Sequence, residues 1–368
     1  MEQLRSSAKG VLPFLLLWSS LSWGQDAVMS QFTMSPTYLN PAYAGYSGDI
    51  TASLQSRIQW EHTPGRFNTQ SFSINGGCPE NRLGFGLQGV SQVEGEGFLR
   101  TYDVAGLISV NLPGRVQDFL GRRLFGRKYI LSAGLRLGVG QKTLDWSELR
   151  FSDQYSHFEG YLSRPSAIQV QNPRETSNVI FDMSAGLRYQ MELNDQGAYL
   201  SMGGALFHIN RPVQTFFGVD EKVPYRYTLH LFTYFPTKKY SNKKEYLSIG
   251  MLANHMGGLK SNTLLLYRDA GPFIKVGVGF RRQNFVRINR NMDALIFQSL
   301  FQINQLTLGY SFDLTISDLG AHRTFGTHEF GITYTFPNSK LCGKGGRPGK
   351  LKCFQLNRGK DKNNIWDL

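Results

Sequence analysis

Hydrophobic and polar residues alternate with a period of two over most of this chain. The clearest example near the C-terminus is GTHEFGITYTF at residues 326–336, where an apolar side chain occupies every second position from Phe330 to Phe336. Small or polar residues lie between them. A strand of about ten residues that is apolar on one face, polar on the other and aromatic at its end is the repeating unit of a transmembrane β-barrel.

The same alternation predicts strands along the rest of the chain. At residues 129–142 Leu131, Leu135 and Val139 face one side, whereas Ser132 and Arg136 face the other. The predicted strands are 51–60, 69–76, 83–93, 98–112, 129–142, 179–191, 197–210, 226–235, 246–254, 262–267, 273–281, 293–303, 306–314 and 326–336. About 14 strands, an even number, predict an all-β fold, a closed antiparallel transmembrane barrel.

The connections between these strands alternate in length. Short turns are expected at 194–196, 268–271 and 304–305, and longer stretches at 143–178, 211–225, 282–292 and 315–325. If the N-terminus starts on the periplasmic side, these short turns are all periplasmic and these longer stretches are all extracellular. That asymmetry is typical of outer-membrane barrels. Two periplasmic connections, 113–128 and 236–245, are longer and break the rule.

The first 24 residues have the pattern of a signal peptide. Arg5 and Lys9 precede an apolar run at 11–21, and Ser22 and Gly24 are small enough for cleavage before Gln25. A membrane anchor is the alternative, but the run is too short to span a bilayer as a helix. We therefore expect an exported protein of the bacterial outer membrane. No later stretch approaches 18 uninterrupted apolar residues, so a closed barrel is its one way to cross lipid.

Three segments follow the leader. Residues 25–48 show neither the apolar spacing of a helix nor the alternation of a strand, and they contain turn-forming Asn40, Pro41 and Gly45. This predicts a loop leading into the barrel, a lid on its mouth, or a loose exported N-terminus. Residues 49–336 form the predicted barrel, and 337–368 form a basic periplasmic tail. The tail has eight Lys or Arg against Asp361 and Asp367, a net charge of +6.

The basic excess of the chain, a formal net charge of +13, gathers in the parts predicted to be periplasmic. Residues 113–128 have the spacing of a short surface helix, with a solvated loop as the alternative, and residues 236–245 add four lysines. This basic face is expected to meet anionic lipid or acidic periplasmic proteins, not nucleic acid. Its predicted partner-binding residues are Arg122, Arg123, Lys238, Lys239, Lys344, Arg347, Lys350 and Lys352.

Cysteine usage fits export. Cys342 and Cys353 bracket a Gly/Pro/Lys-rich loop in the tail, and a disulfide between them would hold that loop in one shape. A zinc pair is the alternative, but the tail has no His to complete a set of ligands. Cys78, in a predicted tight turn, has no evident partner and is expected to stay free.

Catalytic signals are weak, so no enzymatic activity, metal site or cofactor is predicted. The seven histidines are scattered without ligand spacing, and no nucleophile or phosphate-binding motif is present. Polar residues expected in the lumen are Arg136, Asp182, Arg188, Lys275, Asp313 and Glu329. We interpret them as pairing across the interior, with pore selectivity as the alternative.

The longest predicted extracellular loop, 143–178, is rich in aromatic side chains. Exposed aromatics on a long loop are candidate anchors for a partner, although they also pack on one another or on the barrel rim. The candidates are Trp146, Phe151, Tyr155, Phe158 and Tyr161.

Several motifs, in order, resemble the PorP/SprF family, outer-membrane barrels of the type IX secretion system of Bacteroidota. They are NPAYAG at 40–45, RIQW at 57–60 followed by Pro64, TQSFS at 69–73, GFG at 84–86, YSFD at 310–313 and GTHEFGITYTF at 326–336. The resemblance runs from about residue 31 to 336 and leaves out the tail and the 143–178 loop.

The resemblance implies a non-enzymatic component of type IX secretion or gliding motility. Such a barrel would anchor or present a secreted adhesin-type partner at the cell surface and link it to periplasmic, cell-wall-associated components. The alternative is a passive porin or solute channel, which ion conductance by the isolated barrel would favour. An outer-membrane hydrolase is a more distant reading, since no Ser/His pair can be placed on adjacent strand ends.

Overall fold

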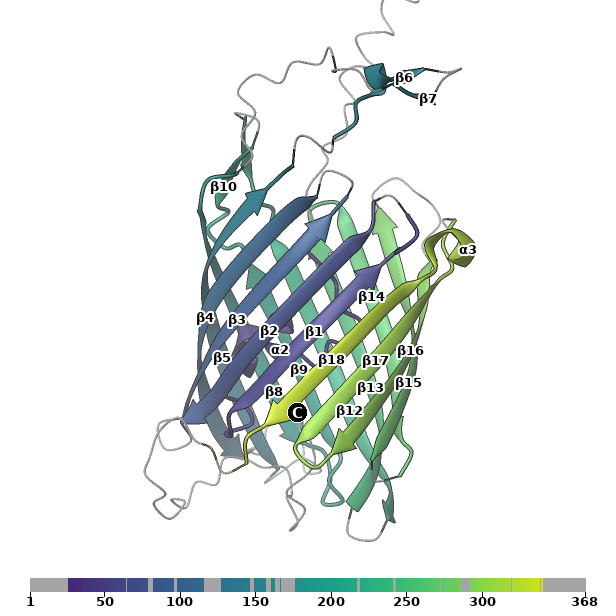
Figure 1. The fold of residues 1–368 in the computed structure, drawn as a ribbon. Helices are drawn as coiled ribbons and strands as arrows, with labels where there is room; N and C mark the ends of the chain where they lie inside the picture. Colours follow the sequence, from purple (N-terminus) through teal and green to yellow (C-terminus); the bar gives the residue numbers. More distant parts are fainter. Residues whose placement is uncertain are drawn as a thin grey trace, which may run out of the picture.

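Fourteen antiparallel strands close into one barrel in the computed structural model (Figure 1). The structure describes residues 26–63, 65–78, 82–95, 98–115, 127–145, 149–156, 160–162, 166, 176–216, 219–240, 243–271, 273–285, 292–318, 320–337 and 339. The prediction of an all-β, closed, antiparallel transmembrane barrel is confirmed. None of the helices within these ranges is long and apolar enough to cross a membrane.

The barrel strands follow one another in chain order, each pairing with its neighbours. They are β1 (Thr51–Gln59), β2 (Phe67–Cys78), β3 (Leu83–Glu94), β4 (Leu99–Arg115), β5 (Lys128–Thr143), β8 (Ile180–Glu192), β9 (Tyr199–Phe207), β12 (Arg226–Tyr240), β13 (Lys243–Met256), β14 (Leu259–Asp269), β15 (Ile274–Phe285), β16 (Met292–Ile303), β17 (Leu306–Thr315) and β18 (Thr327–Thr335). The ring closes where β1 pairs with β18, from Thr51 opposite Thr335 to Gln59 opposite Thr327.

The predicted connection at 236–245 is wrong, because β12 and β13 continue through it as a paired hairpin. The register shifts between Pro236 and Lys238, which marks a bulge. Proline has no N–H to donate to a ladder and is accommodated in sheets at edges or bulges. Similarly, β14 is longer than the predicted strand at 262–267.

The outer face of the barrel is apolar, and the inner face of β5 is made of small and polar residues. In β5, Leu135 and Val139 are 51% and 52% exposed, whereas Ser132 and Arg136, which alternate with them, are buried. Lipid is the solvent for the exposed positions, and the other face needs partners inside the barrel. The face assignment predicted from the alternation in this strand is confirmed.

The two ends of the barrel differ. At the turn end, a tight turn joins β16 to β17 and another joins β8 to β9. At the loop end lie two extra two-stranded sheets, β6 (Tyr155–Ser156) with β7 (Gly160–Tyr161) and β10 (Val213–Phe216) with β11 (Val219–Lys222), together with the short helix α3 (Ala321–Thr324) (Figure 1). The connections after β5, β9 and β17 are therefore long and at the loop end, as predicted. The asymmetry is not complete, because two residues alone join β13 to β14 at the loop end and twelve join β4 to β5 at the turn end.

The chain before β1 lies inside the barrel. We call residues 26–48 the luminal segment; it contains α2 (Pro36–Leu39) and the 3-10 helix η1 (Pro41–Tyr43), and α2 is visible behind the front strands in Figure 1. Met29, Phe32, Met34 and Leu39 are at most 5% exposed. The segment thus occupies the lumen instead of forming a lid across the mouth or a loose end.

A hydrophobic core fills the lumen beside this segment. Phe32 packs with its ring centroid 5.6 Å from that of Phe232, and Tyr199 stacks on Tyr234 at 4.1 Å. Other members of the core come from β13, β14 and β16 and include Leu252, Leu265, Tyr267, Ile296 and Leu300. The interior of this barrel is therefore packed like that of a soluble domain on one side and is polar on the other.

Candidate functional site

The barrel wall carries glycines where the luminal segment touches it. A Cβ added at Gly134 of β5 would lie 2.4 Å from both Ala42 N and Pro41 C. One added at Gly186 of β8 would lie 2.0 Å from Asn40 Oδ1. Real Cβ atoms do not approach so closely, so a larger side chain displaces the backbone of the segment at Gly134 and the Asn40 side chain at Gly186.

The NPAYAG motif at 40–45 is the part of the segment that sits on this wall. Asn40 Nδ2 donates to the Leu187 carbonyl at 2.9 Å and the Gly204 carbonyl at 3.1 Å, while its Oδ1 accepts from Ala42 N at 2.9 Å. Asn40 therefore caps η1 and ties it to two strands of the wall. At the other end of the motif Gly45 has φ of +63°, a conformation that favours glycine.

A buried cluster of charges holds the segment near Ser30. We call Ser30, Arg57, Arg281, Asp313 and Glu329 the Ser30 clamp. Ser30 Oγ donates to Asp313 Oδ2 at 2.6 Å, and Ser30 N donates to Glu329 Oε2 at 2.8 Å. Arg57 bridges both carboxylates, to Asp313 at 3.1 Å and to Glu329 at 3.0 Å. Arg281 adds a second contact to Asp313 at 3.0 Å.

The next residue, Gln31, extends the clamp through its backbone and side chain. Gln31 N donates to Glu329 Oε1 at 2.8 Å, and its Nε2 donates to the Glu329 carbonyl at 2.7 Å. Gln55 Nε2 donates to the Gln31 carbonyl at 2.8 Å, and Gln298 Nε2 donates to the Ser30 carbonyl at 2.8 Å. Buried charges are tolerated when they are paired and hydrogen-bonded in this way, and losing one partner is costly.

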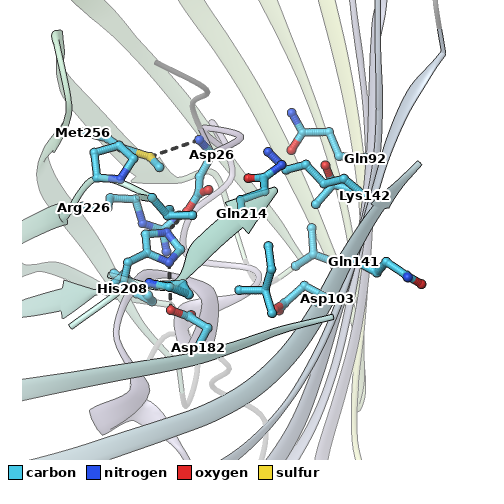
Figure 2. Close-up of a pocket in the computed structure, with 18 of the residues that line it drawn as sticks. Asp26, Gln92, Asp103, Gln141, Lys142, Asp182, His208, Gln214, Arg226 and Met256 are labelled. Atoms are coloured by element: carbon cyan, nitrogen blue, oxygen red, sulfur yellow. Dashed lines mark hydrogen bonds and ion pairs between the residues drawn. The ribbon is translucent and has the colours of Figure 1, made fainter. Parts of the chain in front are cut away.

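A second polar cluster holds the start of the segment at the loop end (Figure 2). We call Asp26, His208, Arg226 and Asp182 the Asp26 latch. Asp26 Oδ2 lies 3.1 Å from His208 Nε2 and 2.9 Å from Arg226. The other ring nitrogen, His208 Nδ1, lies 2.9 Å from Asp182 Oδ1. One imidazole thus joins the luminal segment to β8.

The latch is expected to depend on pH. Burial disfavours the charged imidazolium, but the carboxylates of Asp26 and Asp182 outweigh it and raise the pKa of His208 to about 9. Since this value is above the ordinary 6.5, the stabilisation is complete below pH 6.5 and is lost as pH rises through about 9. The difference corresponds to on the order of 3 kcal/mol.

Hydrogen exchange at the start of the luminal segment measures this loss. At pH 7 the peptide beginning at Asp26 should exchange more slowly in the parent protein than in His208→Gln, and near pH 10 the two rates should converge. Comparing the two proteins at each pH removes the intrinsic acceleration of exchange by base. His255→Gln, at an exposed position of β13, is the matched control and should behave like the parent. If the ratio of the exchange rates of His208→Gln and the parent is the same at pH 7 and near pH 10, the prediction is wrong.

The six residues predicted to face the lumen all lie buried inside the barrel. Arg136 pairs with Asp182 at 2.7 Å and also contacts Asp103. Lys275 lies 3.1 Å from Asp269. Arg188 donates to Gln190 and Ser132 at 3.0 Å each and stacks on the rings of Tyr43 and Tyr46, at 4.8 and 4.0 Å. Asp313 and Glu329 belong to the Ser30 clamp. These contacts favour the interpretation of pairing across the interior.

The aromatic residues predicted as anchors lie partly within the described ranges. Tyr155 and Tyr161 face each other across the β6–β7 pair, with ring centroids 5.6 Å apart, and are 50% and 43% exposed. The guanidinium of Arg150 lies 4.6 Å from the Tyr161 ring. Phe151 is half-buried beside the 3-10 helix η4 (Ser152–Gln154). Trp146 and Phe158 lie outside the described residues.

Most of the predicted basic face lies outside the part of the chain that the structure describes. This applies to Arg122, Arg123, Lys344, Arg347, Lys350 and Lys352. Of the segment 113–128, for which the sequence predicts a short helix, residues 113–115 belong to β4 and residue 128 to β5, and 116–126 lie outside the described residues. Lys238 and Lys239 belong to the extension of β12 at the turn end. Also at that end, Arg127 forms an exposed ion pair with Asp195.

Cys78, at the end of β2, is disulfide-bonded and fully buried, so the prediction that it stays free in a tight turn is wrong. The other two cysteines of the chain, Cys342 and Cys353, lie outside the described residues, and so does the disulfide predicted between them.

Sequence reasoning missed the residues that hold the luminal segment. The Asp26 latch and the Ser30 clamp join positions up to 299 residues apart, which no local pattern reveals. One signal was available, because glycines recur on the polar face of several strands, for example at Gly134 and Gly186. Among the residues described, no three His, Cys, Asp or Glu side chains are grouped to hold a metal ion.

An apolar outer belt, closure through β1 and β18, and a lumen filled by the chain's own N-terminal residues define a plugged transmembrane β-barrel. The family model for the type IX secretion system membrane protein PorP/SprF matches residues 22–334, and the chain belongs to this family. The family and the fold are those of a membrane secretion component and not those of a known enzyme family.

Other comparisons show similarity of fold alone. The toluene transporter TbuX of Ralstonia pickettii is 11% identical with a TM-score of 0.42, covering 83% of this chain and 92% of its own. The P. putida toluene transporter TodX is 10% identical with a TM-score of 0.42, covering 84% and 95%. CdiB from Acinetobacter baumannii is 9% identical with a TM-score of 0.35, and the match covers 78% of this chain and 60% of CdiB. Comparison with curated protein sequences found no match.

Proposed function

We propose that this protein is a closed outer-membrane barrel that holds a secreted, adhesin-type partner at the cell surface and links it to periplasmic components of the type IX secretion or gliding apparatus. Family membership supports a role in secretion. The observation that carries the proposal is the occupied lumen, because it favours a barrel that presents surfaces over one that conducts solutes.

The alternative function, a passive porin, requires the luminal segment to leave the barrel. That would break the contacts of Asn40, expose the paired charges of the Ser30 clamp and undo the packing of Phe32 on Phe232. The ion pairs of the clamp join barrel strands and would remain, but the hydrogen bonds of Ser30 to Asp313 and Glu329 would be lost. Hydrogen bonds to charged groups contribute about 1.5–3 kcal/mol each. An open channel is therefore the less favoured state.

The two ends of the barrel suit different partners. The loop end offers Tyr155 and Tyr161, exposed aromatic side chains of the kind enriched at binding hot spots. The turn end offers the lysine-bearing extension of β12 and β13 and, in sequence, the basic tail. In our proposal the loop end faces the exterior and holds the secreted partner, and the turn end faces the periplasm.

Co-purification from membranes of the tagged barrel with two variants tests both halves. Truncation after residue 338 should lose periplasmic partners and retain the secreted protein, whereas Tyr155→Ser with Tyr161→Ser should do the reverse. Tyr227→Ser, at a position of β12 that is 52% exposed, is the control for losing a surface tyrosine and should change neither set. If the parent and both variants capture the same partners, neither the tail nor the β6–β7 hairpin takes part in partner binding. If the parent captures no secreted protein, the proposed anchoring role is wrong.

A further inference from the structure

A cavity of about 160 Å³ lies at the loop end, between the start of the luminal segment and the barrel wall (Figure 2). Its wall comes from β3, β4, β5 and β8, and residues of the β10–β11 hairpin and the loop after it, including Gln214 and Val223, lie over it. Side chains of the Asp26 latch form part of its lining. A space of this size holds one ring-sized organic molecule.

Two side chains that line this cavity carry hydrogen-bond donors without partners. Gln88 Nε2 of β3 and Arg226 Nε of β12 are buried without any hydrogen-bond partner, in side chains that are 1% and 8% exposed. Lys142 of β5 lines the same cavity and forms no ion pair within the described part of the chain. Figure 2 shows Lys142 across the cavity from Arg226. An orphaned buried donor is costly, and a ligand that supplies acceptor oxygens would satisfy it.

Three of the carboxylates that line the cavity are paired. Asp26 contacts Arg226 and His208, while Asp103 and Asp182 contact Arg136. Glu221 and Lys222, one charge of each sign, also line it. Lys142 acts on the carboxylates of Glu94 and Asp26 only over a longer distance than an ion pair. The remaining lining is largely apolar and includes Tyr38, Val90, Ile180, Phe207 and Met256. The cavity therefore combines an apolar chamber with donors and a lysine that has no direct ion pair within the described residues.

We propose that this cavity binds a carboxylate group attached to a small apolar body, with Lys142 as its counter-ion and Gln88 and Arg226 as additional donors. The carboxylate is carried either by a free organic acid or by an acidic side chain of the secreted partner. The second source rests on the proposed function, whereas the cavity and its donors do not.

Calorimetric titration of the detergent-solubilised barrel with benzoate tests the proposal. Benzoate should bind with a Kd of about 1 mM or tighter. Benzamide, its neutral counterpart of the same shape, should bind at least about tenfold more weakly, because a hydrogen bond to a charged group is stronger than a neutral one. Absence of saturable benzoate binding up to about 10 mM, or equal binding of the two compounds, would overturn it.

Two variants connect the binding to the named donors. Lys142→Gln should weaken benzoate about tenfold and leave benzamide unchanged. Gln88→Leu, on a different strand, should also weaken benzoate and covers the case in which Lys142→Gln does not fold. Lys260→Gln, at an exposed position of β14, is the matched control and should bind like the parent. An unchanged Kd in both cavity variants would refute the assignment.

The same titration on a barrel purified with its secreted partner separates the two sources. If an acidic side chain of the partner fills the cavity, benzoate binding disappears in the complex. If the ligand is a free acid, benzoate binds the complex as it binds the isolated barrel. A failed partner capture would count against the proposed function only, since the titration of the isolated barrel stands on its own.

Discussion

Gly134→Val is expected to unseat the luminal segment and open the barrel to ions. A Cβ at this position would lie 2.4 Å from backbone atoms of Pro41 and Ala42, which are fixed by Asn40 on the neighbouring strands. Rotation of a side chain cannot relieve this clash, because the atoms that clash belong to the backbone. The loss of free energy of seating should therefore exceed the value typical of an overpacked core, about 1–3 kcal/mol. In planar bilayers we expect the parent barrel to be silent and the variant to conduct.

The matched control is Gly106→Val. Gly106 lies on the outer face of β4, and a Cβ built there meets no atom within 4 Å. It introduces the same residue into a barrel strand without touching the lumen, so it should remain silent. Proteolysis supplies a second readout, because residues 26–48 should become cleavable in Gly134→Val alone. A Gly134→Val barrel that folds, stays silent and protects this segment would contradict the seating described above.

Arg57→Met should destabilise the folded barrel more than other single changes to its polar interior. Arg57 contacts both Asp313 and Glu329, and all three side chains are at most 3% exposed. Its loss leaves Asp313 paired with Arg281 and leaves Glu329 without an ion-pair partner among the described residues. Breaking a buried pair in this way costs about 3–5 kcal/mol. The midpoint of urea unfolding in detergent, followed by the heat-modifiable mobility of the barrel on gels, measures the effect.

Two controls show whether charge is the cause. Arg66→Met removes an exposed arginine near the loop end and should shift the midpoint little. Arg57→Met combined with Glu329→Gln removes one charge of each sign and should recover part of the lost stability, since an unpaired charge is worse than a neutral pair. If the double variant is no more stable than Arg57→Met, lost packing of the arginine side chain and not charge explains the effect.

The barrel was predictable because lipid imposes a two-residue period on every spanning strand. That rule identified the strands, their number and the outward face of β5, where Leu135 and Val139 alternate with buried partners. It failed at the ends of β12 and β13, where lysine-rich sequence continues as paired strand.

The luminal segment was not predictable from periodicity, because its structure is set by the wall around it. Asn40 caps a single short turn, and Ser30 finds its partners on β1, β15, β17 and β18. These partners are far apart in sequence, so only barrel closure brings them together. The same holds for the disulfide of Cys78, which appeared unpaired when only its sequence neighbours were considered.

The connection of the luminal segment to β1 constrains the order of assembly. The segment runs from Asp26 at the loop end to Asp49 beside the start of β1, and Gln31 rests on β18 through Glu329. Passing a chain with bulky aromatic side chains through a finished ring would require the core to disperse. The segment must therefore lie against the later strands before the first and last strands meet. The pairing of β1 with β18 then closes the barrel around a segment that is already inside it.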